Sequence, residues 1–140
     1  MFVIIMGCGR VGARLAQMLT AAGHEVTILD IKSSAFSRLG PDFKGTTMLG
    51  NGIDQDLLRR AGIERADAFV AATQGDNRNI MASQIAQHVY GVRRVVTRIY
   101  DPLRSDTFAA LGLRAISPTI IGANSFYEEL TGEKAPALPI

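Results

Sequence analysis

Residues that form disulfides or bind metal ions are scarce in this sequence. Its 140 residues include one cysteine, Cys8, and two histidines, His24 and His88. A single cysteine forms no internal disulfide, and neither histidine stands at metal-ligand spacing from another Cys or His. We therefore expect no disulfide framework and no metal site, and the composition is consistent with a reducing compartment.

Charge of one sign and long apolar runs are lacking as well. The net charge of +2, from 15 basic and 13 acidic residues, is too small to favour nucleic acid as a partner. The apolar run Phe2–Met6 is too short for a membrane span or for the core of an export signal. We therefore expect a cytoplasmic protein that binds no nucleic acid and reaches the inner face of the plasma membrane only through a partner.

Catalytic arrangements are missing too. The sequence offers no Ser-His-Asp set and no convincing pair of general acid and base. A chain of 140 residues is long enough for one domain but too short for a nucleotide-binding domain plus a catalytic one. Because 47% of its residues are hydrophobic and 20% are charged, it has the composition of a folded domain. We expect a folded domain that is not an enzyme by itself.

Short apolar runs alternate with longer amphipathic stretches, a pattern typical of repeated βαβ units. It predicts an α/β fold of the Rossmann-like, doubly wound type, with a parallel sheet in the order 3-2-1-4-5-6 and helices on both faces. Six strands are expected at Phe2–Met6, Glu25–Leu29, Thr46–Leu49, Ala68–Ala72, Arg94–Ile99 and Ala115–Ser117. After a first helix that begins near Val11 and stops before Gly23, further helices are expected at Ser34–Leu39, Gln55–Ala61, Asn77–Tyr90, Ser105–Leu111 and Ile120–Leu130. We expect one domain over residues 1–131 and a tail or linker over 132–140.

A glycine-rich loop directly follows the first strand and opens the first helix. It consists of Gly7, Cys8, Gly9, Arg10, Val11 and Gly12. Gly7 permits a tight turn, Gly9 has no side chain to keep a phosphate from the backbone, and Gly12 lets the helix pack closely on the strand. The free N–H groups at the start of that helix, together with its dipole, would face the phosphates. The backbone of Cys8 matters at this position, and a redox role for its thiol is the less favoured alternative.

A carboxylate at the end of the second strand is the next element of the predicted site. Asp30 stands eighteen residues beyond Gly12, where it can accept hydrogen bonds from both ribose hydroxyls. It would repel a 2′-phosphate, which favours NAD or ATP over NADP, and Lys32 weakens this preference only slightly. Ile31 lies between these two residues. The alternative is that Asp30 caps the turn before Ser33.

Further candidates follow the other strands, because ligands in such folds lie beyond the carboxyl ends of the strands. Asn51, Gly52, Ile53 and Asp54 follow the third strand and are expected near the adenine or ribose, although Asp54 is equally well explained as a helix N-cap. The remaining candidates near the phosphates are Ala72, Thr73, Gln74, Asn79 and Arg98. An arginine inside an apolar strand, as Arg98 is, needs a partner.

Several of these segments share one pattern. Residues 7–12 read G-C-G-R-V-G, residues 50–58 read G-N-G-I-D-Q-D-L-L, and residues 61–68 read A-G-I-E-R-A-D-A. They resemble the motifs G-x-G-R-x-G, G-D-x-x-D-x-x-x-L and A-G-I-x-x-A-D-A of the N-terminal domain of regulators of potassium conductance, the TrkA-N family found in Trk and Ktr potassium-uptake regulatory subunits. The resemblance runs from about Phe2 to Leu130. Asn51 departs from it, because an acidic residue is usual there.

The resemblance implies a regulatory subunit or domain in which an adenine nucleotide, NAD(H), ATP, ADP or AMP, biases how domains of a homo-oligomer pair. An integral membrane potassium transporter or channel would be the partner. Two alternatives remain: the cofactor-binding part of an NAD-dependent oxidoreductase, and the regulatory domain of a cation/proton antiporter. The implied ligand contacts are Gly7, Gly9, Arg10 and Gly12 on the phosphates, Asp30 on the ribose, Asn51–Asp54 near the base, and Thr73, Asn79 and Arg98 around the rest.

The last predicted helix carries more apolar residues than one sheet-facing stripe requires. They are Ile120, Ile121, Ala123, Phe126, Tyr127 and Leu130. Since members of the family pair through helices at the end of this domain, we expect a homodimer or higher homo-oligomer. The alternative is that part of this set packs under the tail.

Overall fold

The protein contains a six-stranded parallel sheet in the order β3-β2-β1-β4-β5-β6, which confirms the predicted doubly wound topology. The computed structural model describes residues 1–138, without the side chains at positions 102, 103, 105 and 106. The strands are β1 (Phe2–Met6), β2 (Glu25–Asp30), β3 (Thr46–Leu49), β4 (Ala68–Ala71), β5 (Arg94–Arg98) and β6 (Arg114–Ile116). From β1 the chain adds β2 and β3 on one side, and then crosses back to add β4, β5 and β6 on the other side of β1. In folds of this type ligands bind at this switch point between β1 and β4.

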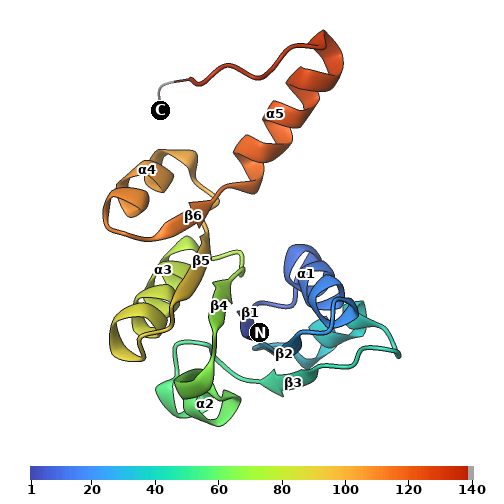
Figure 1. Cartoon of the computed structure of the whole chain (residues 1–140), viewed down its shortest axis with the longest axis vertical. Coiled ribbons are helices and arrows are strands. Elements are labelled where there is room, and N and C mark those ends of the chain that lie inside the picture. The colour runs from blue at the N-terminus through green and yellow to red at the C-terminus, as the bar shows by residue number, and fades with distance from the viewer. Residues whose placement is uncertain (139–140) are drawn as a thin grey trace.

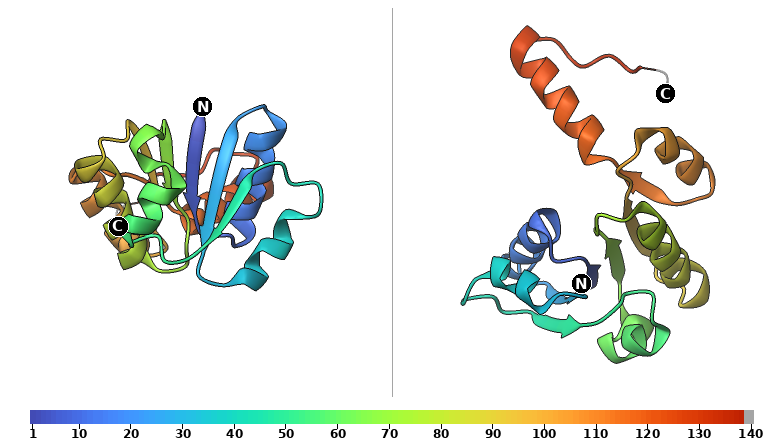
Figure 2. Two further views of the ribbon diagram at one scale, coloured as in Figure 1. Left: turned by 90° about the horizontal axis from the view of Figure 1, so that it is seen from below. Right: turned by 180° about the vertical axis from the view of Figure 1, so that it is seen from behind.

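Helices cover both faces of the sheet (Figure 2). They are α1 (Arg10–Ala21), α2 (Gln55–Ala61), α3 (Asp76–Gln84), α4 (Pro102–Ala110) and α5 (Pro118–Thr131), with the shorter turns η1 (Ser33–Leu39), η2 (Ile63–Arg65) and η3 (Ile85–Val89). Successive residues of β1 point to opposite faces. Ile4 packs with Leu58 of α2 and Ala82 of α3, whereas Ile5 packs with Ala16 of α1. All of β1 is buried, as expected for a strand at the centre of a covered parallel sheet.

Some element boundaries differ from the prediction for identifiable reasons. The sixth strand ends at Ile116 because Ser117 caps α5, its hydroxyl accepting a hydrogen bond from the Ile120 amide. Helix α4 begins at Pro102 and α5 begins at Pro118, since a proline in the first turn loses no intrahelical bond. The long helix predicted at Asn77–Tyr90 is α3 followed by the π-helical turn η3.

Helix α5 projects away from the body of the domain (Figure 1). None of its residues is buried, although the helix carries several large apolar side chains. Gly132 ends it in a left-handed conformation, and residues 133–138 continue without regular structure. The predicted tail 132–140 includes two residues, 139 and 140, that lie outside the described part of the chain.

Candidate functional site

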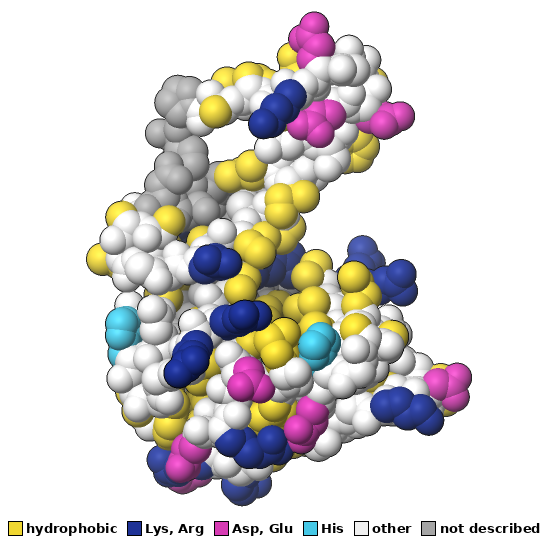
Figure 3. Space-filling view, viewed as in Figure 1, with side chains coloured by type: hydrophobic (Ala, Val, Ile, Leu, Met, Phe, Trp, Pro, Cys, Tyr) yellow, Lys and Arg dark blue, Asp and Glu magenta, His cyan; other side chains and the backbone are white. Residues whose placement is uncertain are grey.

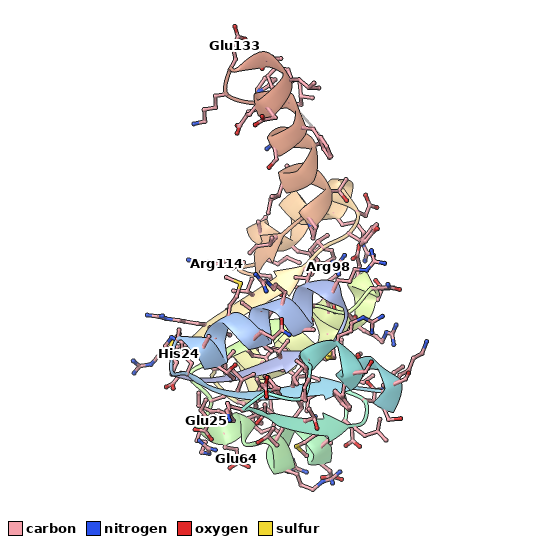
Figure 4. All side chains as sticks on the ribbon, turned by 90° about the vertical axis from the view of Figure 1, so that its right-hand side faces the viewer. His24, Glu25, Glu64, Arg98, Arg114 and Glu133 are labelled. Carbon is pink, nitrogen blue, oxygen red and sulfur yellow. The ribbon has the colours of Figure 1, made fainter. Side chains whose placement is uncertain are left out.

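A cavity of about 820 Å³ opens beyond the carboxyl ends of β1, β2, β4 and β5. This is the edge of the sheet at which the chain reverses its strand order, the usual place for a ligand in a doubly wound fold. Arg98, on the wall of the cavity, lies at the opposite edge of the sheet from His24 and Glu25 (Figure 4). The volume is within the range of small-molecule and cofactor sites.

The glycine loop forms one wall of the cavity, and two of its glycines are required by close approach. Gly7 has a φ of +108°, and a Cβ added there would lie 2.9 Å from the backbone of Ala72 and Thr73. A Cβ added at Gly12 would lie 1.9 Å from the Gly7 carbonyl oxygen. Gly9 is different, because a Cβ there would meet no atom of the protein within 4 Å. It faces the cavity, so its missing side chain leaves room for something that is not protein.

The first turn of α1 presents unused backbone donors at this wall. The first intrahelical bond runs from the Ala13 amide to the Gly9 carbonyl, so the amides of Arg10, Val11 and Gly12 have no acceptor within the helix. The N-cap residue, Gly9, has no side chain to cap the helix, and the first turn contains no acidic residue. The positive end of the helix dipole is therefore left for an anion to occupy.

Asp30 holds this loop in addition to lining the cavity. Its Oδ2 accepts a hydrogen bond from the Cys8 amide at 2.8 Å, and its Oδ1 accepts one from the Lys32 amide at 2.8 Å. The second bond is the local turn considered as an alternative for this residue. A carboxylate has about four lone-pair sites, so two bonds leave capacity for ribose hydroxyls. Asp30 can thus brace the loop and still accept from a sugar.

Basic side chains dominate the walls of the cavity. Of the described side chains, five basic ones line it, Arg10, Lys32, Arg38, Arg78 and Arg98, together with one acidic side chain, Asp30. The Nε of Arg98 is buried and has no hydrogen-bond partner among the described residues. A buried donor left unpaired is costly, so this arrangement fits an anionic ligand that supplies the missing acceptor. The groups around the cavity therefore suit phosphates.

Most of the predicted site residues come together on these walls. The residues on the cavity wall are Gly7, Cys8, Gly9, Arg10, Val11, Asp30, Ile31, Lys32, Asn51, Gly52, Ala72, Thr73, Gln74 and Arg98. Four predicted residues are placed away from the wall: Gly12, Ile53, Asp54 and Asn79. None of these placements tests contact with a ligand.

The structure gives each of those four residues another role, and Ile53 packs against the core formed by β1, α2 and α3. Gly12 packs against the Gly7 carbonyl beneath the loop. Asp54 is the N-cap of α2, where its carboxylate accepts from the amides of Asp56 and Leu57. Asn79 is completely buried and hydrogen-bonded to Thr73 and to the carbonyl of Arg98.

Seven residues on the wall were not predicted: Met6, Leu29, Ala35, Arg38, Gly50, Arg78 and Tyr100. Met6, Leu29 and Tyr100 lie at or just beyond the ends of strands, a position that could have identified them, whereas Ala35 lies within η1. Arg38 and Arg78 belong to η1 and α3, and no sequence pattern separates them from other surface arginines. Arg38 donates to the Cys8 carbonyl at 3.4 Å, which connects η1 to the glycine loop.

The thiol of Cys8 is buried beneath the loop and donates to the Ala35 carbonyl at 3.4 Å. Burial raises the pKa of this thiol, and the nearby Asp30 carboxylate raises it further, while Arg38 acts in the opposite direction. Since the thiolate is the reactive form, these surroundings disfavour redox chemistry at Cys8. Among the side chains that the structure describes, no cluster of three or more His, Cys, Asp or Glu is placed to hold a metal ion.

The fold and the site together define a Rossmann-like domain with a cavity suited to a nucleotide at the switch point of its sheet. The model of the TrkA-N domain family matches residues 3–118, and the chain belongs to this family. Over the described residues, no helix is long and apolar enough to cross a membrane.

Relatives in this family are potassium-uptake proteins. The Trk system potassium uptake protein TrkA of Streptomyces coelicolor is 48% identical over 117 residues, which are 84% of this chain and 52% of that protein. A TrkA homolog of Methanothermobacter thermautotrophicus is 32% identical over 139 residues, which are 99% of this chain and 64% of that protein. The chain thus spans between half and two thirds of these relatives.

Three solved structures with the same fold are described as bound to AMP, NAD or ADP. The Kef CTD of Shewanella denitrificans in its AMP-bound form has a TM-score of 0.80 at 25% identity, over 94% of this chain and 80% of that chain. The GsuK channel bound to NAD has a TM-score of 0.79 at 25% identity, over 92% and 23%. GsuK bound to ADP gives the same TM-score and identity, over 94% and 34%.

Proposed function

We propose that the protein binds an adenine nucleotide in the cavity at the switch point and acts as a regulatory domain of potassium transport. The observation that carries this proposal is the set of anion donors, the α1 amides and five basic side chains, that line one cavity of about 820 Å³. In this arrangement the phosphates lie against Gly9, Arg10 and Val11, and the ribose lies against Asp30. The adenine then extends toward Ile31 and Asn51.

Asp30 supports a ligand with an unphosphorylated ribose. A 2′-phosphate would meet this carboxylate, so NAD, ATP, ADP and AMP are favoured over NADP. A thermal-shift series with NAD, NADH, NADP, ATP, ADP and AMP tests the proposal, because a ligand that binds only the folded state raises the melting temperature by mass action. At least one nucleotide with an unphosphorylated ribose must stabilise the protein, and NADP must stabilise it less. Failure of all six to shift the melting temperature would contradict the proposal.

A regulatory role is favoured over a catalytic one. The relatives are named as potassium-uptake proteins, and the GsuK neighbour is named as a channel. Among the described side chains on the cavity wall there is no histidine, serine or glutamate, and Asp30, the carboxylate there, is already bonded to the amides of Cys8 and Lys32. We propose that the domain signals by binding, at the inner face of the membrane, to an integral potassium transporter or channel subunit.

Self-association through α5 is the means we propose for transmitting the signal. Phe126 is 75% exposed and Leu130 is 84% exposed, which is unfavourable for a helix that remains in water. Hydrophobic side chains also gather in the hollow between α5 and the body of the domain (Figure 3). Burying the apolar face of α5 against a second copy would remove this surface from water.

The path from the cavity to α5 is short. Arg98, the last residue of β5, pairs in register with Ile116 of β6, and Ser117 then caps α5. A phosphate held by Arg98 is thus one strand away from the helix that carries the proposed interface. A nucleotide shifts the arrangement of an oligomer only if it binds two arrangements with different affinity, and a contact this close to the interface is a place where affinities can differ.

A further inference from the structure

Asn79 makes an unusually complete set of hydrogen bonds for a buried side chain. It is 0% exposed and lies in the first turn of α3. Its Oδ1 accepts from the Thr73 amide at 3.0 Å and from the Thr73 hydroxyl at 2.6 Å. Its Nδ2 donates to the Thr73 carbonyl and to the Arg98 carbonyl, each at 2.9 Å. Every hydrogen-bonding site of the NH₂ group is therefore used within the protein.

The two ends of this amide have distinct partners. Exchanging its oxygen and nitrogen would turn the NH₂ group toward the Thr73 amide and the oxygen toward two carbonyls, so the hydrogen bonds determine its orientation. Each bond joins α3 to the carboxyl end of a strand: Thr73 follows β4, and Arg98 ends β5. Asn79 thus connects the parts of the cavity edge that lie on the β4–β5 side.

Both residues that Asn79 binds, Thr73 and Arg98, line the cavity. The backbone of Thr73 lies so close to Gly7 that a Cβ at Gly7 would meet the Thr73 nitrogen at 2.9 Å. Arg98 lines the cavity with its Nε buried and unpaired among the described residues. Its Cζ lies 5.2 Å from the centre of the Tyr100 ring, which also lines the cavity. Asn79 itself does not reach the wall.

The position of Arg98 indicates which part of a ligand it would serve. It belongs to β5, two strands from β1 in the order β1-β4-β5, or about 10 Å at the usual strand spacing. Asp30, at the proposed ribose position, lies on the other side of β1, in β2. A ligand whose first phosphate lies on the glycine loop therefore approaches Arg98 only with groups beyond that phosphate.

We propose that Asn79 is a positioning residue that touches no ligand and holds Arg98 and Thr73 in place for the phosphate groups beyond the first. The inference rests on the proposed nucleotide site. It replaces the expected ligand contact of Asn79 with an indirect role, and it gives the site a part that distinguishes ADP and NAD from AMP.

The experiment measures binding of AMP, ADP and NAD by titration calorimetry to the whole chain and its variants. Asn79→Ala and Arg98→Ala should each weaken ADP and NAD by about tenfold or more, the usual size of one lost hydrogen bond to a charged group, and change AMP by less than about threefold. The double variant should lose less than the sum of the two single losses, because Asn79 acts through the residues it holds, Arg98 among them. Thr73→Val removes the hydroxyl that donates to Asn79 and accepts from the Gly75 amide, and it should give a smaller loss of the same kind.

Ser83→Ala is the matched control. Ser83 is also fully buried on α3, and its Oγ accepts a hydrogen bond from Thr97 of β5 at 2.6 Å, but it does not line the cavity. This variant should lower the melting temperature and leave all three affinities unchanged. A merely structural role for Asn79 would weaken all three ligands alike.

The results separate the inference from the function on which it rests. If the unaltered protein binds none of the three nucleotides, both are overturned. If it binds them, an equal loss for AMP and ADP in Asn79→Ala, or additive losses in the double variant, overturns the positioning role alone. If Asn79→Ala does not fold, Thr73→Val decides, and an unchanged ratio of ADP to AMP affinity in that variant rejects the inference.

Discussion

Single residues of the glycine loop show how similar substitutions can act through different physics. Gly12 has no room for a side chain, because an added Cβ would lie 1.9 Å from the Gly7 carbonyl oxygen. Gly9 has ample room within the protein, and its backbone is extended, with φ at −79°. Gly12 is therefore needed by the fold, and Gly9 is needed by whatever occupies the cavity.

These two glycines give a paired prediction. Gly12→Ala should lower the free energy of unfolding by about 3 kcal/mol through overpacking against backbone. Gly9→Ala should change it by less than about 0.5 kcal/mol, yet weaken ADP by about tenfold because the methyl group stands between the phosphate and the loop amides. Chemical denaturation and calorimetry measure the two quantities. A stable Gly12→Ala variant, or a Gly9→Ala variant with unaltered ADP affinity, would contradict this assignment.

The Cys8 thiol provides a prediction about pH. Its folded pKa is raised above that of a free thiol, first by burial and then by Asp30. The buried thiol therefore contributes its stability below the ordinary thiol pKa and loses it as pH rises through the raised value. At pH 8 we expect a disulfide reagent such as DTNB to react far more slowly with the folded protein than in denaturant. Equal rates in both conditions would show that the thiol is accessible and ionised.

The contrast between Asp30 and Asn79 shows which roles of single residues can be predicted from the sequence. The glycine loop and Asp30 could be predicted because each follows a strand at a spacing set by one βαβ unit. The bond from Asn79 to Arg98 joins residues 19 positions apart, and no local pattern encodes it. Arg38 and Arg78 were missed for the same reason, since their place on the wall depends on how η1 and α3 pack.

At the scale of elements, apolar periodicity predicted all six strands and the sheet order, while the ends of elements followed local chemistry. Ser117 was expected in the last strand, but its hydroxyl accepts from the Ile120 amide and begins α5. The four N-terminal amides of a helix need acceptors, so a Ser or Asp at the boundary joins the helix when its side chain can supply one. Such caps depend on side-chain geometry, which periodicity does not report.

Helix α2 allows a direct test of this distinction. Asp54 was predicted either as a ligand contact or as an N-cap, and in the structure it caps α2 and lies off the cavity wall. Asp54→Ala should lower stability by about 1 kcal/mol, or about 3 °C in melting temperature, and leave ADP affinity unchanged. Asp42→Ala, at an exposed position outside the helices, is the control and should change neither quantity. A loss of ADP affinity in Asp54→Ala would show that this residue contributes to binding and would contradict its assignment as an N-cap alone.

At the scale of the whole molecule, α5 is the element that the body of the domain does not bury. Its apolar side chains were expected to exceed what one sheet-facing stripe needs, and none of its residues is buried. The tail described to Leu138 leaves Leu130 84% exposed, so it does not cover the end of the helix. Association with another chain would remove this surface from water.

Charge placed on α5 should therefore abolish self-association. Phe126→Asp combined with Leu130→Asp should give a monomer at concentrations where the unaltered protein is a dimer or larger, measured by light scattering after size-exclusion chromatography. Val89→Asp, at an exposed apolar position on η3, should leave the mass unchanged. A strictly monomeric unaltered protein at high concentration would reject the interface.

The central claim is that the amides at the start of α1 bind the phosphates of an adenine nucleotide. An amide-resolved NMR titration with ADP tests it most directly, because each backbone N–H of the loop reports separately. We predict saturable shifts concentrated at Gly9, Arg10 and Val11, with smaller shifts near Asp30 and Thr73. A spectrum that does not change with ADP, or shifts confined to residues away from the carboxyl edge of the sheet, would contradict the claim.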